Sequence, residues 1–168
     1  PISTNIELSF AENQLKGDDE TLMKQFFYNF WYTRNEIDPE LEWNNYNELV
    51  KMAQKEFSTS IKKGYATDRG RIFLKYDKPN SRTEVKSEPN AYPYEIWHYY
   101  KAGNFSNIKF VFYSPDVITN DYPLLHSNLP GETKNPQWKV QLHRRTNQPV
   151  NMNEENNADY WLDRAGEY

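Results

Sequence analysis

Cysteine is absent from this sequence, which excludes disulfide bonds, thiolate metal sites and a cysteine nucleophile. A chain that can bury an adequate core needs no disulfide in an oxidising or a reducing compartment, so the redox setting stays open. Long apolar runs are also missing, and none approaches the roughly 18 residues of a membrane-spanning helix. We therefore predict no transmembrane segment within this chain.

Positive charge is in deficit. The formal net charge is −4 at pH 7, and the sequence pI is about 5.5. Nucleic acids are polyanions, and the proteins that bind them cluster Lys and Arg to release counterions. The densest basic cluster here is the short run from His143 to Arg145, which is typical of a solvated patch. We expect no nucleic-acid partner.

Aromatic side chains are abundant. The 168 residues include 13 Tyr, 9 Phe and 5 Trp, which together make up 16 % of the chain. A chain of this length fits one domain and can enclose one core without disulfide or metal crosslinks. We predict a single α+β domain over residues 1–168, with a core built largely from aromatic rings.

The first third of the chain carries helical signals after a short arm. Apolar residues alternate between Ile6 and Phe10, which favours a strand or an extended arm over residues 1–17. Over residues 18–63, apolar residues recur at steps of three and four behind acidic N-cap candidates such as Asp38. This spacing predicts a hairpin of two helices.

Residues 64–126 are predicted to form an antiparallel sheet. Aromatic and β-branched residues gather in short runs that are bounded by turn formers. The predicted strands are residues 71–76, 94–100, 108–113 and a fourth at 122–126. The polar stretch at residues 77–93 reads as a long loop between the first two strands.

Residues 127–168 have no persistent period, which predicts a tail that wraps over the domain. We expect Trp138, Val140 and Leu142 to be its docking points. Residues 158–168 read as the start of a final helix.

The segment over residues 64–70, which reads Gly-Tyr-Ala-Thr-Asp-Arg-Gly, resembles the signature of the bacterial GWxTD family. In that family Gly-Trp-x-Thr-Asp-Arg-Gly leads into a strand, and Tyr65 takes the place of the tryptophan. The aromatic helix ending near Arg34, the Asp38-Pro39 pair and the later strands also resemble the family, so the likeness covers residues 18–126.

The resemblance implies a bacterial protein that is secreted or associated with the cell envelope, in the periplasm or at the outer membrane. It implies partners that are another envelope protein or other domains of the same polypeptide. The family carries no settled reaction, and the sequence indicates no cofactor. We therefore expect a non-catalytic module for protein interaction or assembly.

Two interpretations of the motif remain open. In the first it is a structural hinge, in which Gly64 takes a positive φ, Thr67 and Asp68 bond backbone amides, and the arginines pair with nearby acids. In the second, the amides after Thr67 and the guanidinium of Arg69 bind a carboxylate or another anion.

One face of the predicted sheet carries aromatic rings with charges between them. It is expected to lie opposite the helical hairpin and to carry Phe73, Trp97, Tyr99 and Tyr113, with Lys75 and Glu95 among them. Either the tail covers this face as a second core layer, or it is a docking surface for a protein or for stacked sugar rings. The candidate binding residues are therefore Tyr65, Thr67, Asp68, Arg69, Arg71, Glu95, Trp97 and Tyr99.

Catalytic signals are few. His98, His126 and His143 lack the spacing of a metal pair, and the chain has neither a Gly-x-Ser-x-Gly elbow nor a glycine-rich phosphate loop. Asp68 and Glu95 are the remaining pair, and one of them would need an apolar pocket that raises its pKa to act in glycoside cleavage. The alternative hypothesis is thus a domain that binds or cleaves carbohydrate.

Overall fold

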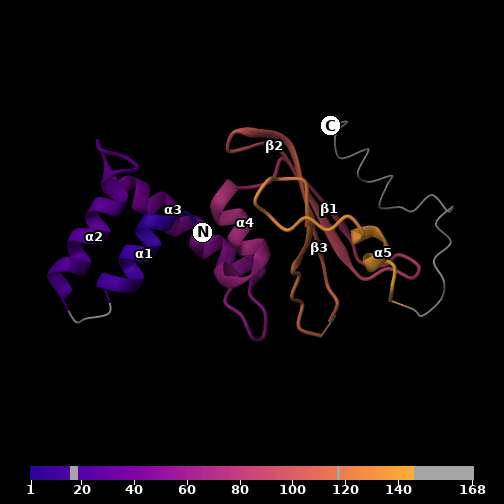
Figure 1. The fold of residues 1–168 in the computed structure, drawn as a ribbon. Helices are drawn as coiled ribbons and strands as arrows, with labels where there is room; N and C mark the ends of the chain where they lie inside the picture. The colour runs from indigo at the N-terminus through magenta and orange to yellow at the C-terminus, as the bar shows by residue number, and fades with distance from the viewer. Residues whose placement is uncertain (16–18, 117, 146–168) are drawn as a thin grey trace.

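The computed structural model describes residues 1–15, 19–116 and 118–145. Its elements are α1 (Asn5–Gln14), α2 (Glu20–Tyr32), α3 (Pro39–Phe57), the 3₁₀ turn η1 (Gly64–Ala66), α4 (Asp68–Tyr76), β1 (Ser81–Val85), β2 (Tyr94–Ala102), β3 (Phe105–Tyr113), β4 (Leu124–Ser127) and α5 (Trp138–Leu142). Helices α1 and α2 lie at one end of the molecule, α4 in the middle, and the sheet with α5 at the other end (Figure 1). The predicted α+β class is confirmed.

The predicted helical hairpin is present as α2 and α3. Asp38 caps α3 by accepting a hydrogen bond from the Leu41 amide at 2.9 Å, and Asp19 caps α2 in the same way. The two helices meet through aromatic rings, with the centroids of Trp31 and Trp43 5.5 Å apart. The helical period of the sequence therefore correctly predicted this part of the fold.

The prediction of an extended arm over residues 1–17 is wrong, because this stretch contains helix α1. Thr4 and Glu7 form a reciprocal capping box that satisfies the first amides of the helix. Phe10 stacks on Phe26 of α2, with ring centroids 5.3 Å apart. The capping box favours a helix here, and residues 5–14 pair with no strand of the sheet. The alternation of apolar residues was therefore a misleading signal.

An ion pair joins α1 to the turn that follows α2. The guanidinium of Arg34 donates to both carboxylate oxygens of Glu7 at 2.8 and 2.9 Å and to the carbonyl of Ile2 at 3.0 Å. These hydrogen bonds from Arg34 hold the pKa of the Glu7 carboxyl down at about 2. No residue of α1, all of which the structure describes, is buried, so the ion pair matters more here than it would beside a core.

We expect Glu7→Gln to lower the hydrogen-exchange protection of the α1 amides roughly fivefold, which is about 1 kcal/mol. Because folding depresses the pKa of Glu7, its contribution is complete above about pH 4.5 and is lost as the pH falls towards 2. The protection factors of wild type and Glu7→Gln should therefore converge over that interval. Glu12→Gln in the same helix is the control, and an equal effect there would contradict the assignment.

The sheet is antiparallel with the strand order β1-β2-β3-β4. The strands predicted at residues 94–100, 108–113 and 122–126 are confirmed as β2, β3 and β4. Strand β1 lies inside the stretch that was predicted to be a loop. The strand was not predicted because its sequence is polar. As an edge strand it pairs only with β2 and needs no continuous apolar face.

The strand predicted at residues 71–76 is wrong, because these residues belong to helix α4. Thr67 caps this helix, and the buried side chains of Arg69, Ile72 and Phe73 follow at steps of three and four. The run of aromatic and β-branched residues was misread as a strand because α4 buries a broad face against both α3 and the sheet.

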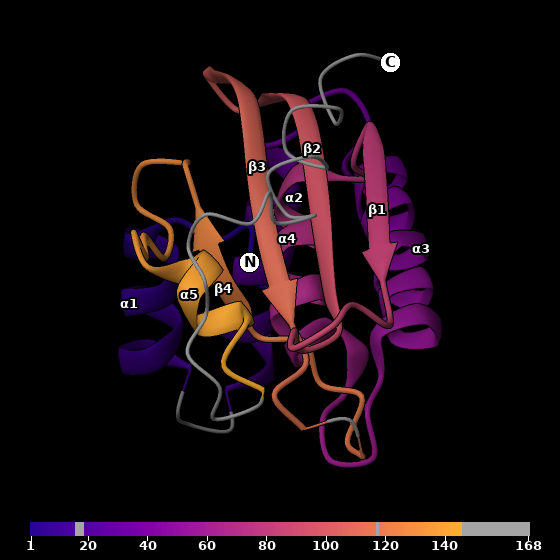
Figure 2. The same cartoon turned by 90° about the vertical axis from the view of Figure 1, so that its right-hand side faces the viewer.

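One face of the sheet packs against α3 and α4, and the short helix α5 covers part of the other face (Figure 2). Trp97, Phe110 and Phe112 pack on Phe57 of α3 and on Phe73 of α4. On the other face, Tyr94, Ile96 and Val111 pack against residues that include Trp138 and Leu142 of α5.

This arrangement corrects the predicted docking face. Trp97 and Tyr99 are 0 % and 1 % exposed, since they point towards the helices and not away from them. The face was assigned to the wrong side because Phe73 and Lys75 were placed on a strand beside them. Trp97 and Tyr99 are core residues.

Trp138 and Leu142 dock as predicted, within the short helix α5. The helix predicted over residues 158–168 lies outside the described residues. In the part of the chain that the structure describes, no helix is both long and apolar enough to cross a membrane.

Candidate functional site

The motif segment packs its backbone directly against α3. A Cβ atom added to Gly64 would lie 2.0 Å from the carbonyl oxygen of Ala53, and one added to Gly70 would lie 1.9 Å from the carbonyl oxygen of Gly64. Neither glycine has a positive φ, so the positive φ predicted for Gly64 is wrong. Both positions require glycine because of close backbone approach, and α3, η1 and α4 could not otherwise pack this tightly.

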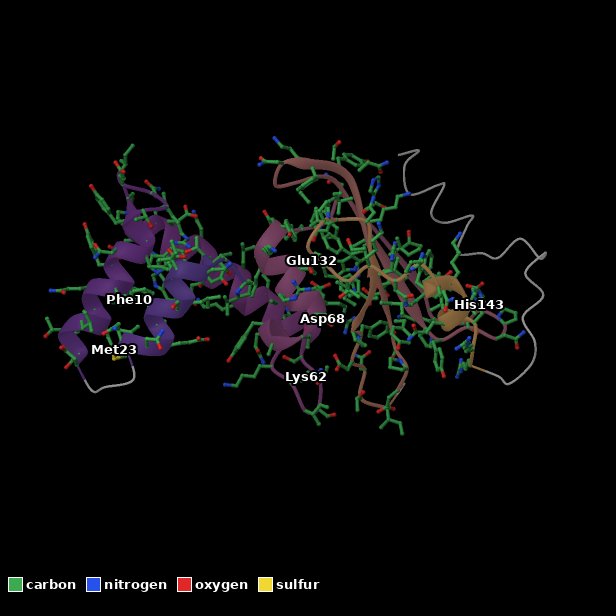
Figure 3. The ribbon with its side chains drawn as sticks, in the orientation of Figure 1. Phe10, Met23, Lys62, Asp68, Glu132 and His143 are labelled. Carbon is green, nitrogen blue, oxygen red and sulfur yellow. The ribbon has the colours of Figure 1, made fainter. Side chains whose placement is uncertain are left out.

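Thr67 and Asp68 bond backbone groups, as the structural interpretation of the motif predicted. The Thr67 hydroxyl accepts from the Gly70 amide at 3.1 Å and donates to the Gly64 carbonyl at 2.8 Å. Asp68, labelled in Figure 3, accepts from the Leu124 amide at 2.9 Å. The motif therefore caps its own helix and ties that helix to β4.

Arg69 and Glu95 form a buried ion pair between α4 and β2. Their closest nitrogen and oxygen are 2.7 Å apart, and each side chain is 4 % exposed. The second Glu95 oxygen accepts from Arg82 Nε at 3.1 Å and from the Trp97 indole at 2.9 Å. Both oxygens of this carboxylate are thus occupied by donors from three directions.

Aromatic rings enclose the two guanidinium groups of this cluster. The Arg69 guanidinium lies 4.2 Å from the centroid of Tyr122 and 5.4 Å from that of Phe57, which Arg82 also approaches at 5.7 Å. Burial raises the pKa of the Tyr122 hydroxyl, so that ring stays neutral. For Arg82, burial lowers the pKa, but the neighbouring carboxylates, Glu95 foremost, outweigh burial and raise it overall.

These contacts bear on two hypotheses: glycoside cleavage by Glu95 and anion binding by Arg69. Glu95 has no free oxygen with which to act as a general acid or base, because Arg69, Arg82 and Trp97 hold both of its oxygens. Arg69 faces that carboxylate and the Asn120 carbonyl, so its guanidinium is turned away from solvent. The geometry is that of a structural cluster that joins α4, β1 and β2.

A second ion-pair cluster joins α4 to the loop after β4. Glu132, labelled in Figure 3, accepts from Arg71 at 3.0 and 2.8 Å and from Lys75 at 3.3 Å. Burial alone would raise the pKa of Glu132, but these cations lower it overall. Arg71 also approaches Asp68 at 3.6 Å. Each charged residue of the motif therefore has a partner inside the domain.

A glycine pair in backbone contact, a threonine cap and an aspartate and an arginine facing the sheet account for the pattern of residues 64–70. The family model of the GWxTD domain matches residues 2–143. This chain belongs to the GWxTD domain family. Comparisons with curated proteins and with solved structures give no match.

The GWxTD motif does not assemble the predicted site residues into one open site. Arg69, Glu95 and Trp97 meet in the buried cluster, whereas Tyr99 donates to the Asp77 carbonyl elsewhere in the core. Tyr65, which occupies the Trp position of the motif, is 40 % exposed. Arg82 and Glu132 were missed, because nothing in the local sequence shows that residues so distant complete these ion pairs.

Most of the large apolar side chains that are exposed in the described part of this GWxTD domain lie in one region that was not predicted. It lies on the helical lobe, which we define as residues 1–15 and 19–57. Among the described residues, fifteen large apolar side chains are exposed, and the ten on this lobe are Ile6, Leu8, Phe10, Met23, Phe27, Tyr28, Tyr32, Ile37, Leu41 and Met52. Phe10 and Met23 are labelled in Figure 3. The apolar run of α2 signalled this surface, but it was read as core.

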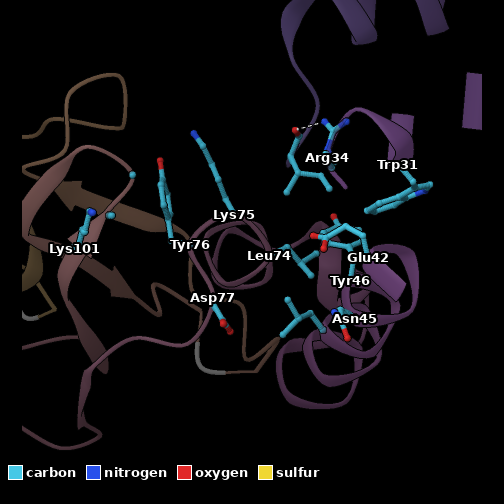
Figure 4. Close-up of a pocket in the computed structure, with 14 residues that line it drawn as sticks. Trp31, Arg34, Glu42, Asn45, Tyr46, Leu74, Lys75, Tyr76, Asp77 and Lys101 are labelled. Carbon is cyan, nitrogen blue, oxygen red and sulfur yellow. Dashed lines mark hydrogen bonds between the residues drawn. The ribbon is translucent and has the colours of Figure 1, made fainter. Parts of the chain in front are cut away.

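A groove of about 440 Å³ lies between the helical lobe on one side and the end of α4 with the β2–β3 turn on the other (Figure 4). Trp31 and Tyr46 line it on the lobe side, and Lys75 and Tyr76 line it on the α4 side. Within residues 1–15, 19–116 and 118–145, no three His, Asp or Glu side chains gather as metal ligands, in this groove or elsewhere. Beside the groove, Ala53 and Phe57 near the end of α3 pack the lobe onto α4 and the sheet.

Proposed function

We propose that this GWxTD domain is a non-catalytic interaction module of a bacterial envelope or secreted protein, and that its helical lobe is the contact surface. One observation carries the proposal: α1 buries none of its residues and α2 buries only Trp31, although both helices are rich in large apolar side chains. Exposed apolar surface of this kind is typical of protein contact sites.

The contrast with the rest of the domain supports this reading. The sheet and α4 bury Trp97, Phe110 and Ile72 almost completely, so this sequence can build a closed core where it needs one. The charged residues of the motif are paired within the domain, as described above. The open surface is therefore confined largely to the helices, where a partner can complete the packing.

A photocrosslinking amino acid at Tyr28 tests the proposal in the full-length protein in its native bacterium. Tyr28 is exposed on α2, so the substitution leaves the core intact. We expect a discrete crosslinked band from position 28 and none from position 105, where Phe105 is exposed on β3. Absence of a band at position 28, or an identical band at both positions, would contradict a contact surface on the lobe.

A further inference from the structure

Exposed apolar side chains flank the turn between α2 and α3. Four apolar side chains, which we call the turn surface, are exposed here: Tyr28 at 58 %, Tyr32 at 40 %, Ile37 at 97 % and Leu41 at 51 %. Tyr28 and Tyr32 stack on each other, with ring centroids 5.8 Å apart. The turn surface thus consists of a stacked pair of tyrosine rings on α2 and two exposed aliphatic side chains, one in the turn and one at the start of α3.

Helix α2 has more apolar circumference than its neighbours cover. Successive residues of a helix lie about 100° apart, and a helix that is apolar on every side is normally buried. Eight of the thirteen residues of α2 are Leu, Met, Phe, Trp or Tyr. Phe26 faces α1 and Trp31 faces α3, whereas Tyr28 and Tyr32 have no helix over them in the described chain.

The net charge of the sequence around the turn surface is negative. From residue 24 to residue 51 it has five acids and three cations, Lys24, Arg34 and Lys51, each of which is paired with an acid. Over residues 1–57 there are eleven Asp and Glu against five Lys and Arg, whereas residues 58–168 have thirteen against fifteen. The negative charge of the protein is therefore concentrated on the lobe that carries the exposed rings.

We propose that the turn surface binds a basic amphipathic helix of a partner protein, an inference that rests on the proposed function. The apolar stripe of such a helix would pack on Tyr28, Tyr32 and Leu41. Its Lys and Arg side chains would face Glu36 and Glu40 and lie over tyrosine rings. Charge complementarity selects this partner over one with an acidic helix.

The same charges argue against two other occupants. A second copy of this chain would bring like charges together if it docked through the same surface. An anionic bilayer would repel the acidic rim around Glu36 and Glu40.

Three labelled 18-residue peptides test the proposal against the full chain by fluorescence anisotropy. The first has Leu at helical spacing and Lys elsewhere, the second has Glu in place of Lys, and the third scrambles the first. We expect the Leu/Lys peptide to bind at least about tenfold more tightly than the other two and to weaken with added salt. Equal binding of the Leu/Glu or the scrambled peptide would overturn the proposal.

Substitutions locate the binding. Ile37→Ser with Leu41→Ser should weaken the Leu/Lys peptide at least about tenfold, because both side chains are exposed and available for contact. Glu36→Gln with Glu40→Gln should weaken it and reduce its salt dependence. Ile118→Ser is the matched control, since Ile118 is 94 % exposed outside the lobe and should leave binding unchanged. Circular dichroism verifies that each variant is folded.

The outcomes separate this inference from the proposed function. If the Leu/Lys peptide binds Ile37→Ser/Leu41→Ser as well as wild type, the turn surface is not its site. If the protein sediments as a dimer and these substitutions abolish the dimer, the occupant is a second copy of the chain and not a basic helix. If the protein binds phosphatidylserine vesicles, the occupant is an anionic bilayer. If no peptide binds but Tyr28 still crosslinks to a partner, the inference fails and the proposed function stands; if neither occurs, both fail.

Discussion

Gly70→Ala is expected to destabilise the domain by about 3 kcal/mol or more, measured by urea unfolding. A glycine inside a helix is normally improved by alanine, which gains roughly 0.5–1 kcal/mol. In α4 we expect alanine to destabilise the helix instead, because the new Cβ would lie 1.9 Å from the carbonyl oxygen of Gly64. A rigid backbone atom cannot give way as a side-chain end can, so α4 would have to move off η1 and α3.

Gly103→Ala provides the comparison. A Cβ at Gly103 meets nothing within 4 Å, but the φ of +60° makes any side chain costly, by about 1 kcal/mol. The expected order of stability is therefore wild type, then Gly103→Ala, then Gly70→Ala well below both. Stability of Gly70→Ala equal to wild type would show that the helices are not in backbone contact.

Glu95→Ala is expected to cost about 3–5 kcal/mol in the same measurement, because it leaves the guanidinium of Arg69 buried without its carboxylate. Arg82 and the Trp97 indole would lose an acceptor as well. Removing a partner from a buried ion pair costs more than the net stabilisation that the pair provides.

Glu84→Ala is the matched control for Glu95→Ala. Glu84 also pairs with Arg82, at 2.9 Å, but its side chain is 40 % exposed. A pair of that kind contributes little, so we expect a change within about 0.5 kcal/mol. If Glu95→Ala were as mild as Glu84→Ala, the cluster would not hold the sheet to α4, and a chemical role for Glu95 would regain support.

The helical hairpin and three of the four strands could be predicted from the sequence because their signals are local. Capping residues such as Asp38 and the alternation along β2 act over a few neighbouring positions. Helix α1 also had a local signal, the Thr4–Glu7 capping box, but the alternation of apolar residues concealed it.

Helix α4 and strand β1 could not be predicted, because tertiary contacts decide them. The Thr67 cap and the Arg69–Glu95 pair stabilise a helix in a stretch whose aromatic and β-branched residues favour a strand. Strand β1 exists because β2 offers it a pairing edge; its own sequence, Ser-Arg-Thr-Glu-Val, is polar.

The structural interpretation of the motif correctly predicted the hydrogen bonds and ion pairs of its side chains, but its positive φ for Gly64 was wrong. Thr67 and Asp68 bond backbone amides, and Arg69 pairs with Glu95, as expected from residue type. The role of the two glycines could not be deduced, because a close approach between segments leaves no trace in a single sequence. The exposed aromatic surface was missed for a related reason: the periodicity of α2 shows which residues are apolar, but not how many neighbours cover them.

The placement of Tyr65 has a consequence for how this motif tolerates variation. Its ring extends outward with the Lys63 ammonium 5.8 Å from its centroid, whereas the glycines on either side of the motif are fixed by backbone packing. The fold thus restricts the aromatic position of the motif much less than its glycines, and a library randomised at position 65 should yield many folded proteins. The same library at position 64 or 70 should return glycine almost alone.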